Sequence, residues 1–178
     1  GGASVKDAEA IRNVGRILTL HKNNKLIIVV SAIGKTTNLL ERLIDAYWNE
    51  NGVKSIFDEF KSFHKTIIND LKLTNSSTFH THFTALEDKL NSNKSDDYNF
   101  EYDQLICFGE LLSTAIISEY LIENSYKCAW VDARQVISTN NKWREAKVNW
   151  ELTEQNYSAQ VPALFESNDF IVTQGFIG

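Results

Sequence analysis

Residues 25–37 read KLIIVVSAIGKTT, and this stretch decides the fold class. Its first half is an unbroken run of aliphatic, mostly β-branched residues. Side chains of a strand point alternately to its two sides, so a run that is apolar at every position is typical of a parallel strand covered on both faces. The second half is a short polar turn. After it, apolar residues recur at helical spacing (Leu39, Leu40, Leu43, Ile44 and Tyr47). Strand, turn and helix in this order predict the first unit of an α/β fold.

Two further stretches repeat the strand pattern. YKCAWVDA at 126–133 and NDFIVTQGFIG at 168–178 each read as a buried strand that ends in a loop. Between the strands, apolar periodicity predicts helices over about 5–21, 53–73, 78–91, 99–124 and 153–166. The sequence therefore predicts an α/β fold in which a mainly parallel sheet is sandwiched by helices, in Rossmann-like layers.

Some finer features of this pattern can also be predicted. Ser4 followed by Asp7 resembles a capping box, so we expect the first helix to begin there. VNWEL at 148–152 fits a short strand. We predict one domain over residues 1–178, in which about 53–98 form a helical insertion.

Composition and charge narrow the function classes. The 178 residues carry a net charge of −5, with lysines and arginines scattered among acids, which argues against a nucleic-acid or anionic-membrane surface. There is no signal peptide and no unbroken apolar run of 18 residues, so we expect a cytoplasmic protein. Cys107 and Cys128 are isolated in the sequence, and we expect them to be reduced and buried. The HTH triplet at 80–82 lies in a predicted helix, where its spacing does not suit a metal site.

Ligands of such folds bind at the carboxyl ends of the strands. After the first strand, the letters GKTT suggest a phosphate-binding P-loop, but that motif requires a glycine at position 29, where this chain has Val29. Two interpretations remain open. The segment is either a polar turn that begins a helix, or a loop that holds an anionic group through Ser31, Thr36, Thr37 and the helix N-terminus.

Glu110 is a single carboxylate in the apolar stretch LICFGELLSTAII. Cys107, Ser113 and Thr114 share its helix face, and no lysine or arginine of this segment lies there. A desolvated carboxylate needs a partner. That partner is either a distant side chain of the protein or the ammonium group of an amino-acid substrate.

Three weaker candidates complete the list. GGAS at 1–4 combines glycines, which allow close backbone approach, with the start of a helix; a cloning scar would give the same letters. Asp132 and Arg134 follow the second strand, and an internal ion pair explains them best. QGFIG at 174–178 follows the third strand and carries Phe176.

In order along the chain, the segments resemble an aspartokinase of the amino-acid-kinase superfamily. They are GGASV (1–5), VVSAIGKTTNLL (29–40), CFGELLS (107–113), VDAR (131–134), EAKVNWELT (145–153) and TQGFIG (173–178). The resemblance implies transfer of the γ-phosphoryl group of ATP, with Mg²⁺, to the side-chain carboxylate of L-aspartate. This is the first step toward lysine, threonine and methionine. It also implies a homo-oligomer in the full-length enzyme.

The resemblance assigns roles to individual residues. Ser31, Thr37, Glu110 and Phe176 are expected to bind aspartate, with Glu110 on its ammonium group. The native segment Gly1, Gly2, Ala3 and Ser4 is expected to approach the ATP phosphates, although the family usually has threonine where this chain has Ala3.

The expected catalytic residues lie outside the chain, in a lysine before the two glycines and an R-G-G-S-D segment after Gly178. We therefore expect an aspartate-binding half of a catalytic domain that is inactive by itself. Another amino-acid or carbamate kinase, or a non-catalytic aspartate-binding module, remains an alternative.

Overall fold

The computed structural model describes residues 1–177, so Gly178, the last residue of the predicted 174–178 loop, lies outside the described part. Three parallel strands form one sheet in the order β1-β3-β2. They are β1 (Leu26–Val30), β2 (Cys128–Trp130) and β3 (Phe170–Gln174). The central strand β3 is the last in sequence, and it pairs Val30 with Gln174 on one side and Trp130 with Val172 on the other.

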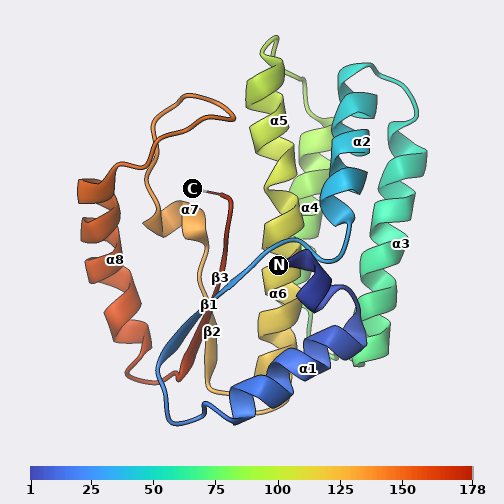
Figure 1. Cartoon of the computed structure of the whole chain (residues 1–178). Coiled ribbons are helices and arrows are strands. Elements are labelled where there is room, and N and C mark those ends of the chain that lie inside the picture. Colours follow the sequence, from blue (N-terminus) through green and yellow to red (C-terminus); the bar gives the residue numbers. More distant parts are fainter. Residues whose placement is uncertain (178) are drawn as a thin grey trace.

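Helices cover this sheet on two sides (Figure 1). A short 3₁₀ helix, η1 (Gly2–Val5), precedes α1 (Ala8–Thr19), α2 (Thr36–Trp48), α3 (Val53–Leu71), α4 (Ser77–Asn91), α5 (Tyr98–Ile106), α6 (Phe108–Glu123), α7 (Ala133–Val136) and α8 (Trp150–Leu164). Helices α1 to α6 stand on one side of the sheet, and α7 and α8 on the other (Figure 1). The predicted fold class is confirmed.

Two predicted boundaries are wrong. The first long helix begins at Ala8, because the carboxylate of Asp7, rather than Ser4, accepts the hydrogen bond of a first-turn amide, Ala10 N, at 2.8 Å. The residues before Asp7 form η1. The predicted strand at 148–152 is reduced to a single antiparallel bridge between Val148 and Thr139. Helix α8 starts directly afterwards, because the Asn149 side chain caps it by accepting from Leu152 N at 3.1 Å.

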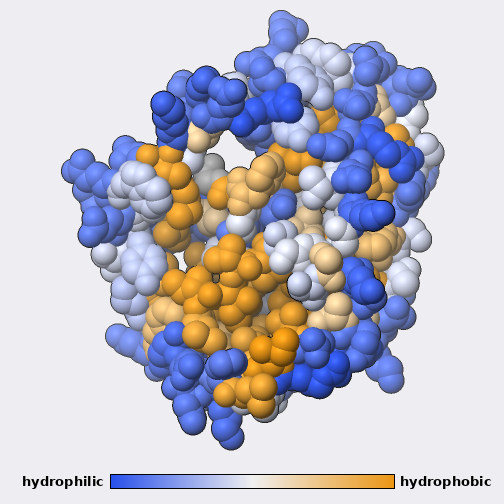
Figure 2. All heavy atoms as spheres, viewed as in Figure 1, coloured by the Kyte–Doolittle hydropathy of each residue, from blue (hydrophilic) through white to orange (hydrophobic). Residues whose placement is uncertain are grey.

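Strand β1 differs from the expectation that both of its faces are covered. Leu26, Ile28 and Val30 point toward the helical side, whereas Ile27 and Val29 are 42% and 63% exposed. Ile27 lies in register with Ile171 of β3, which packs against Val161 of α8. Helix α8 therefore covers the β3 and β2 part of this face and leaves the β1 edge open. Apolar side chains form a continuous area at the centre of the molecular surface in this view (Figure 2).

The core is organised around α6. Its side chains from Phe108 to Glu119 are all buried, and they pack against the strands, α2 and α4. Together with α5 it forms one helical stretch, Tyr98–Glu123, that is long and apolar enough to cross a membrane by length and composition, but 89% of its most apolar window is buried inside the protein. Cys107 and Cys128 are free and buried, as expected, and burial raises the pKa of each thiol to about 12.

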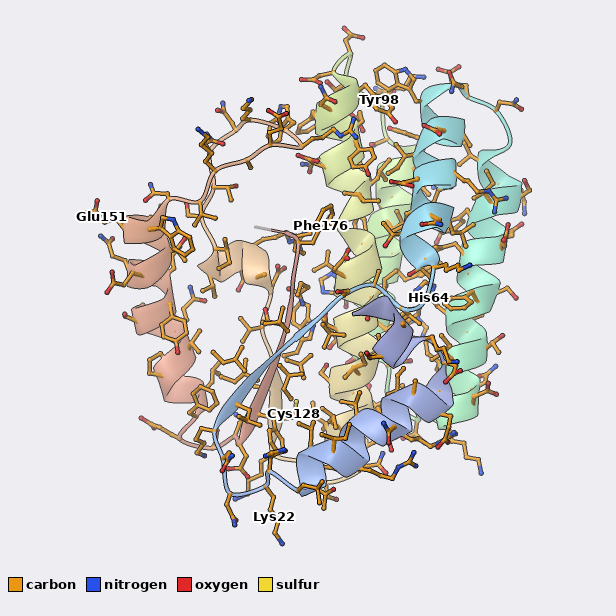
Figure 3. The ribbon with its side chains drawn as sticks, viewed as in Figure 1. Lys22, His64, Tyr98, Cys128, Glu151 and Phe176 are labelled. Atoms are coloured by element: carbon orange, nitrogen blue, oxygen red, sulfur yellow. The ribbon has the colours of Figure 1, made fainter. Side chains whose placement is uncertain are left out.

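His64 is buried in an aromatic cluster between α3 and α4 (Figure 3). Its ring lies 4.3 Å from that of Phe60 and 6.0 Å from that of Phe79, measured between centroids. Nδ1 bonds to the carbonyl oxygen of Phe60 at 2.9 Å, and Nε2 has no hydrogen-bond partner among the described residues. Because burial disfavours the charged imidazolium, it lowers the pKa of His64 to about 4.

We expect His64 to make the fold acid-sensitive. The unfolded chain takes up this proton near pH 6.5, whereas the folded chain does so only near pH 4, so stability is full above pH 6.5 and falls as the pH decreases toward 4. The expected loss between pH 7 and pH 5 is about 2 kcal/mol. Urea unfolding at both values, for the wild type and for His64→Leu, measures it as the difference between the two proteins. Exposed His80→Leu on α4 is the control and should keep the wild-type profile. Parallel profiles for wild type and His64→Leu would contradict the prediction.

Candidate functional site

The loop after β1 turns sharply into α2. Gly34 has φ +57°, a left-handed conformation that favours glycine. Thr36 is buried, and both its backbone amide and its hydroxyl donate to the Ile33 carbonyl oxygen, at 3.0 and 2.7 Å. For Thr36 the structure favours the polar-turn interpretation, because the turn itself uses the hydroxyl hydrogen. Thr37 lies half-buried in the first turn of α2, and within residues 1–177 its hydroxyl makes no hydrogen bond.

The N-terminal glycines lie against this same loop. The Gly34 amide donates to the Gly2 carbonyl oxygen at 3.1 Å. A Cβ atom on Gly2 would lie 2.7 Å from the Gly34 carbonyl oxygen and 2.8 Å from that of Ala32, so only glycine fits. The fold thus brings together two candidates that are 30 residues apart in the sequence, the 1–4 segment and the 31–37 loop.

Glu110 approaches the loop from the first turn of α6. Its Oε1 accepts the Ala32 amide at 3.2 Å, and Ser113, one turn later, donates its hydroxyl to the Ser31 carbonyl oxygen at 2.7 Å. Gly109 allows this close approach, since a Cβ there would lie 3.1 Å from the Cβ of Ala32. Two residues of the polar helix face predicted from the sequence, Glu110 and Ser113, therefore hold the β1 loop.

The second oxygen of Glu110 is unpaired. The residue is only 4% exposed, and Oε2 has no hydrogen-bond partner within residues 1–177. Desolvation raises the pKa of this carboxyl group above its ordinary value. The hydrogen bond from the Ala32 amide lowers the pKa, but by less. The sequence left two possible partners for Glu110, a distant side chain of the protein or the ammonium group of a substrate. Among residues 1–177, no cationic side chain pairs with it. A carboxylate with one anchored and one free oxygen can bind an ammonium group from a ligand.

Asp132 and Arg134 form the predicted internal ion pair. The guanidinium donates to both carboxylate oxygens of Asp132, with a shortest distance of 2.6 Å. The same carboxylate caps α7 by accepting Arg134 N at 3.0 Å. This pair holds the pKa of Asp132 below its usual value, although burial acts in the opposite direction. The ion pair and the cap therefore give Asp132 and Arg134 a structural role in the turn after β2.

Phe176 extends from the end of β3. Its backbone is left-handed, with φ +69°, and its side chain is 74% exposed. It lines a cavity of about 450 Å³ together with Cys107 and Arg134. Figure 3 shows Phe176 at the end of β3, toward α5 and α6. Glu110 and Thr37 are not among the residues that line this cavity, so the cavity does not join them to Phe176.

Gln174 and Trp130 are polar contacts of this region that the sequence pattern did not indicate. Both donate to the hydroxyl of Thr114, one turn after Glu110 on α6. The one feature of the sequence that could have indicated these contacts is the side-chain amide of Gln174, at the end of the apolar strand FIVTQ. Within residues 1–177 there is no group of three or more His, Cys, Asp or Glu side chains that could hold a metal ion.

Comparisons with known proteins agree on one family. A model of the amino acid kinase family matches residues 1–178. Lysine-sensitive aspartokinase 3 of Escherichia coli (strain K12) is 27% identical over 184 residues, which cover 100% of this chain and 39% of that protein. The aspartokinase of Chlamydia muridarum is 28% identical, with coverages of 100% and 38%. The chain therefore spans about two fifths of the length of these relatives.

Solved structures show the same likeness. The crystal structure of E. coli aspartokinase III in complex with lysine and aspartate superposes with a TM-score of 0.83 at 25% identity, covering 99% of this chain and 39% of that one. The aspartate kinase of Clostridium acetobutylicum has the same fold, with a TM-score of 0.78 at 20% identity over 99% of this chain and 37% of that one. From the match over its whole length, the chain belongs to the amino acid kinase family.

Proposed function

We propose that this chain is the aspartate-binding part of an aspartate kinase, which transfers the γ-phosphoryl group of ATP to the side-chain carboxylate of L-aspartate. The observation that carries the proposal is Glu110, whose free carboxylate oxygen is buried beside a loop at the carboxyl end of β1. The relatives named above are aspartokinases, which supports this substrate, and one of the solved relatives was crystallised with aspartate.

The charge of the site favours an α-amino acid as the ligand. Glu110 supplies a buried anion for the ammonium group, since charge-assisted hydrogen bonds gain strength where water is excluded. Thr37 offers a hydroxyl in the first turn of α2, where the helix dipole favours a carboxylate. Ser31 belongs to the same loop, and its carbonyl oxygen accepts the hydroxyl of Ser113. We propose that Phe176 covers the substrate from the third loop.

The nucleotide phosphates are proposed to lie at the 1–4 segment. The amides of Gly2 and Ala3 begin η1, so they have no acceptor inside that helix. Gly1 and Ser4 complete the segment, and their small size leaves the backbone accessible. ATP supplies the phosphoryl group, and Mg²⁺ accompanies it through the phosphates, as is usual for this ion. Phosphoryl transfer between two anions also needs cationic side chains. By resemblance, the family supplies these charges with a lysine and an arginine.

The wider assignments follow from the same family. We propose that a longer protein containing residues 1–178 acts in the cytoplasm as a homo-oligomer. Its reaction would be the first step in the synthesis of lysine, threonine and methionine. Residues 53–98 are proposed to be a helical insertion of the catalytic domain. No nucleic acid or membrane partner is proposed.

Aspartate binding to the 178-residue chain tests the proposal directly. Isothermal titration should show saturable binding of L-aspartate. N-acetyl-L-aspartate keeps both carboxylates but has no ammonium group, so it should not bind. L-Glutamate, one methylene longer, should bind about 10-fold more weakly or worse. In a coupled assay of the longer protein, phosphorylation of glutamate, N-acetylglutamate or carbamate in place of aspartate would identify another kinase of the family. Binding of aspartate without ATP turnover would indicate a non-catalytic module.

A further inference from the structure

The hydroxyl group of Thr114 is the centre of a buried hydrogen-bond network. Its hydrogen is donated to the Glu110 carbonyl oxygen at 2.8 Å. Its oxygen accepts two bonds, one from Trp130 Nε1 at 2.9 Å and one from Gln174 Nε2 at 2.6 Å. A hydroxyl group has one donor and two acceptor positions, and here all three are used. Thr114 is fully buried, and the network joins α6 to both β2 and β3.

Gln174 extends this network to the turn after β2. Its Oε1 accepts the amide of Ala133, the first residue of α7, at 2.6 Å. The residue is 4% exposed, and its backbone pairs with Val30 of β1. Gln174 therefore connects the ends of all three strands to α6: its side chain bonds to α6 and to the turn after β2, and its backbone pairs with β1. No water is needed for this arrangement, because each polar atom of the Gln174 side chain has a partner in the protein.

The two ends of this network lie next to two parts of the proposed aspartate site, the Glu110 carboxylate and the Phe176 loop. Thr114 bonds to the residue that carries the free carboxylate, Glu110, and Gln174 immediately precedes Gly175 and Phe176. The Gly175 amide donates to the Val30 carbonyl oxygen at 3.3 Å, so the start of the Phe176 loop is fixed on both sides. Without these bonds α6 and β3 would be joined here only by apolar packing, which tolerates sliding because it is not directional.

We propose that Thr114 and Gln174 are positioning residues for the amino-acid substrate. They hold the Glu110 carboxylate at a fixed distance from the Phe176 loop and from the β1 loop that Glu110 anchors. The inference rests on the proposed function, because it presumes that Glu110 and Phe176 face the same ligand. Neither residue needs to contact that ligand. A displacement of about 1 Å in such elements can change reaction rates by about 100-fold.

Thr114→Val is the primary test because valine has nearly the shape of threonine but no hydroxyl group. In the longer enzyme we expect the KM for aspartate to rise about tenfold or more, with the KM for ATP unchanged. In the 178-residue chain the Kd for aspartate should rise by a similar factor. Thr114→Ser keeps the hydroxyl group and should restore binding to within about threefold of the wild type. Gln174→Met removes the other partner and should have the same effect, which keeps the test available if Thr114→Val does not fold.

Ser118→Ala is the matched control. Ser118 lies one turn after Thr114 on α6 and is also buried. Among residues 1–177 its hydroxyl bonds only to the Ala115 carbonyl oxygen of its own helix, at 3.0 Å. This variant also loses a buried hydroxyl group and should leave both KM values and the aspartate Kd unchanged.

The outcomes separate the inference from the proposed function. A lower melting temperature with an unchanged aspartate Kd in both Thr114→Val and Gln174→Met would show a purely structural network, and the aspartate site would stand. An equal rise in the KM for ATP and for aspartate would show general damage to the domain and would also overturn the inference. Failure of the wild-type chain to bind aspartate would refute the proposed function and this inference with it.

Discussion

Glu110→Gln should raise the Kd of the chain for L-aspartate by about 30- to 150-fold. The substitution keeps the shape of the side chain and a carbonyl oxygen for the Ala32 amide, but it removes the charge that would face the ammonium group. A hydrogen bond to a charged group in a buried site contributes about 2–3 kcal/mol, which gives this range. Isothermal titration with L-aspartate measures the effect. ATP affinity in the longer enzyme should hardly change.

Glu119→Gln is the matched control for this variant. Glu119 is a second buried glutamate of α6, and one of its oxygens also has no hydrogen-bond partner in the described part of the chain. Burial raises its pKa as well. Its Oε1, however, accepts the amide of Thr78 at 2.7 Å and so caps α4, away from the β1 loop. Aspartate binding should be unaffected by Glu119→Gln. An unaltered Kd in Glu110→Gln would show that Glu110 is a structural residue like Glu119.

The same carboxylate predicts a pH dependence of binding. Burial raises the pKa of Glu110, and only its ionised form attracts an ammonium group. Aspartate affinity should therefore be highest above that raised pKa and fall as the pH decreases through it. The ratio of wild-type to Glu110→Gln affinity, measured across pH, removes the titration of aspartate itself. A constant ratio would contradict the assignment.

Gly2→Ala should reduce kcat/KM for aspartate in the longer enzyme by about 100-fold or more. The new Cβ atom would lie within 2.8 Å of two backbone carbonyl oxygens, those of Gly34 and Ala32, and neither can move alone. Ala32 also gives its amide to Glu110, so the displacement reaches the carboxylate as well as the proposed phosphate segment. A coupled assay measures the loss, and aspartate titration shows how much of it arises in binding.

Gly52→Ala controls for a general loss of stability in that experiment. Gly52 has φ +74°, so alanine is strained there by about 1 kcal/mol, but it precedes α3 in the helical region, and a Cβ atom would meet only Ser55 Oγ at 3.9 Å. We expect a lower melting temperature and an unchanged aspartate Kd. If Gly2→Ala behaved in the same way, the tight packing of the 1–4 segment would have no role in the site.

Much of the fold could be predicted because local patterns carry it. The aliphatic run 26–30 and the two later runs became the three parallel strands, and helical periodicity located the long helices. The predictions failed at helix boundaries, where one of several neighbouring polar residues caps the helix. Asp7 rather than Ser4 caps α1, and Asn149 starts a helix inside the predicted strand at 148–152. Such choices depend on single hydrogen bonds, which hydrophobic patterns do not encode.

The sequence by itself determined the family, the strand-end loops and the unusual position of Glu110 in an apolar helix. Only the tertiary structure decided which polar groups remain available. It uses the Thr36 hydroxyl within its own turn and pairs Asp132 with Arg134. It leaves one oxygen of Glu110 buried and without a hydrogen-bond partner among residues 1–177. It also packs Gly2 so closely against the β1 loop that a Cβ atom there would not fit. Thr114 and Gln174, 60 residues apart in the sequence, are joined by a hydrogen bond. The physical reason is that burial and hydrogen bonding are properties of contacts between distant segments, whereas a sequence pattern reports only the periodicity of one segment at a time.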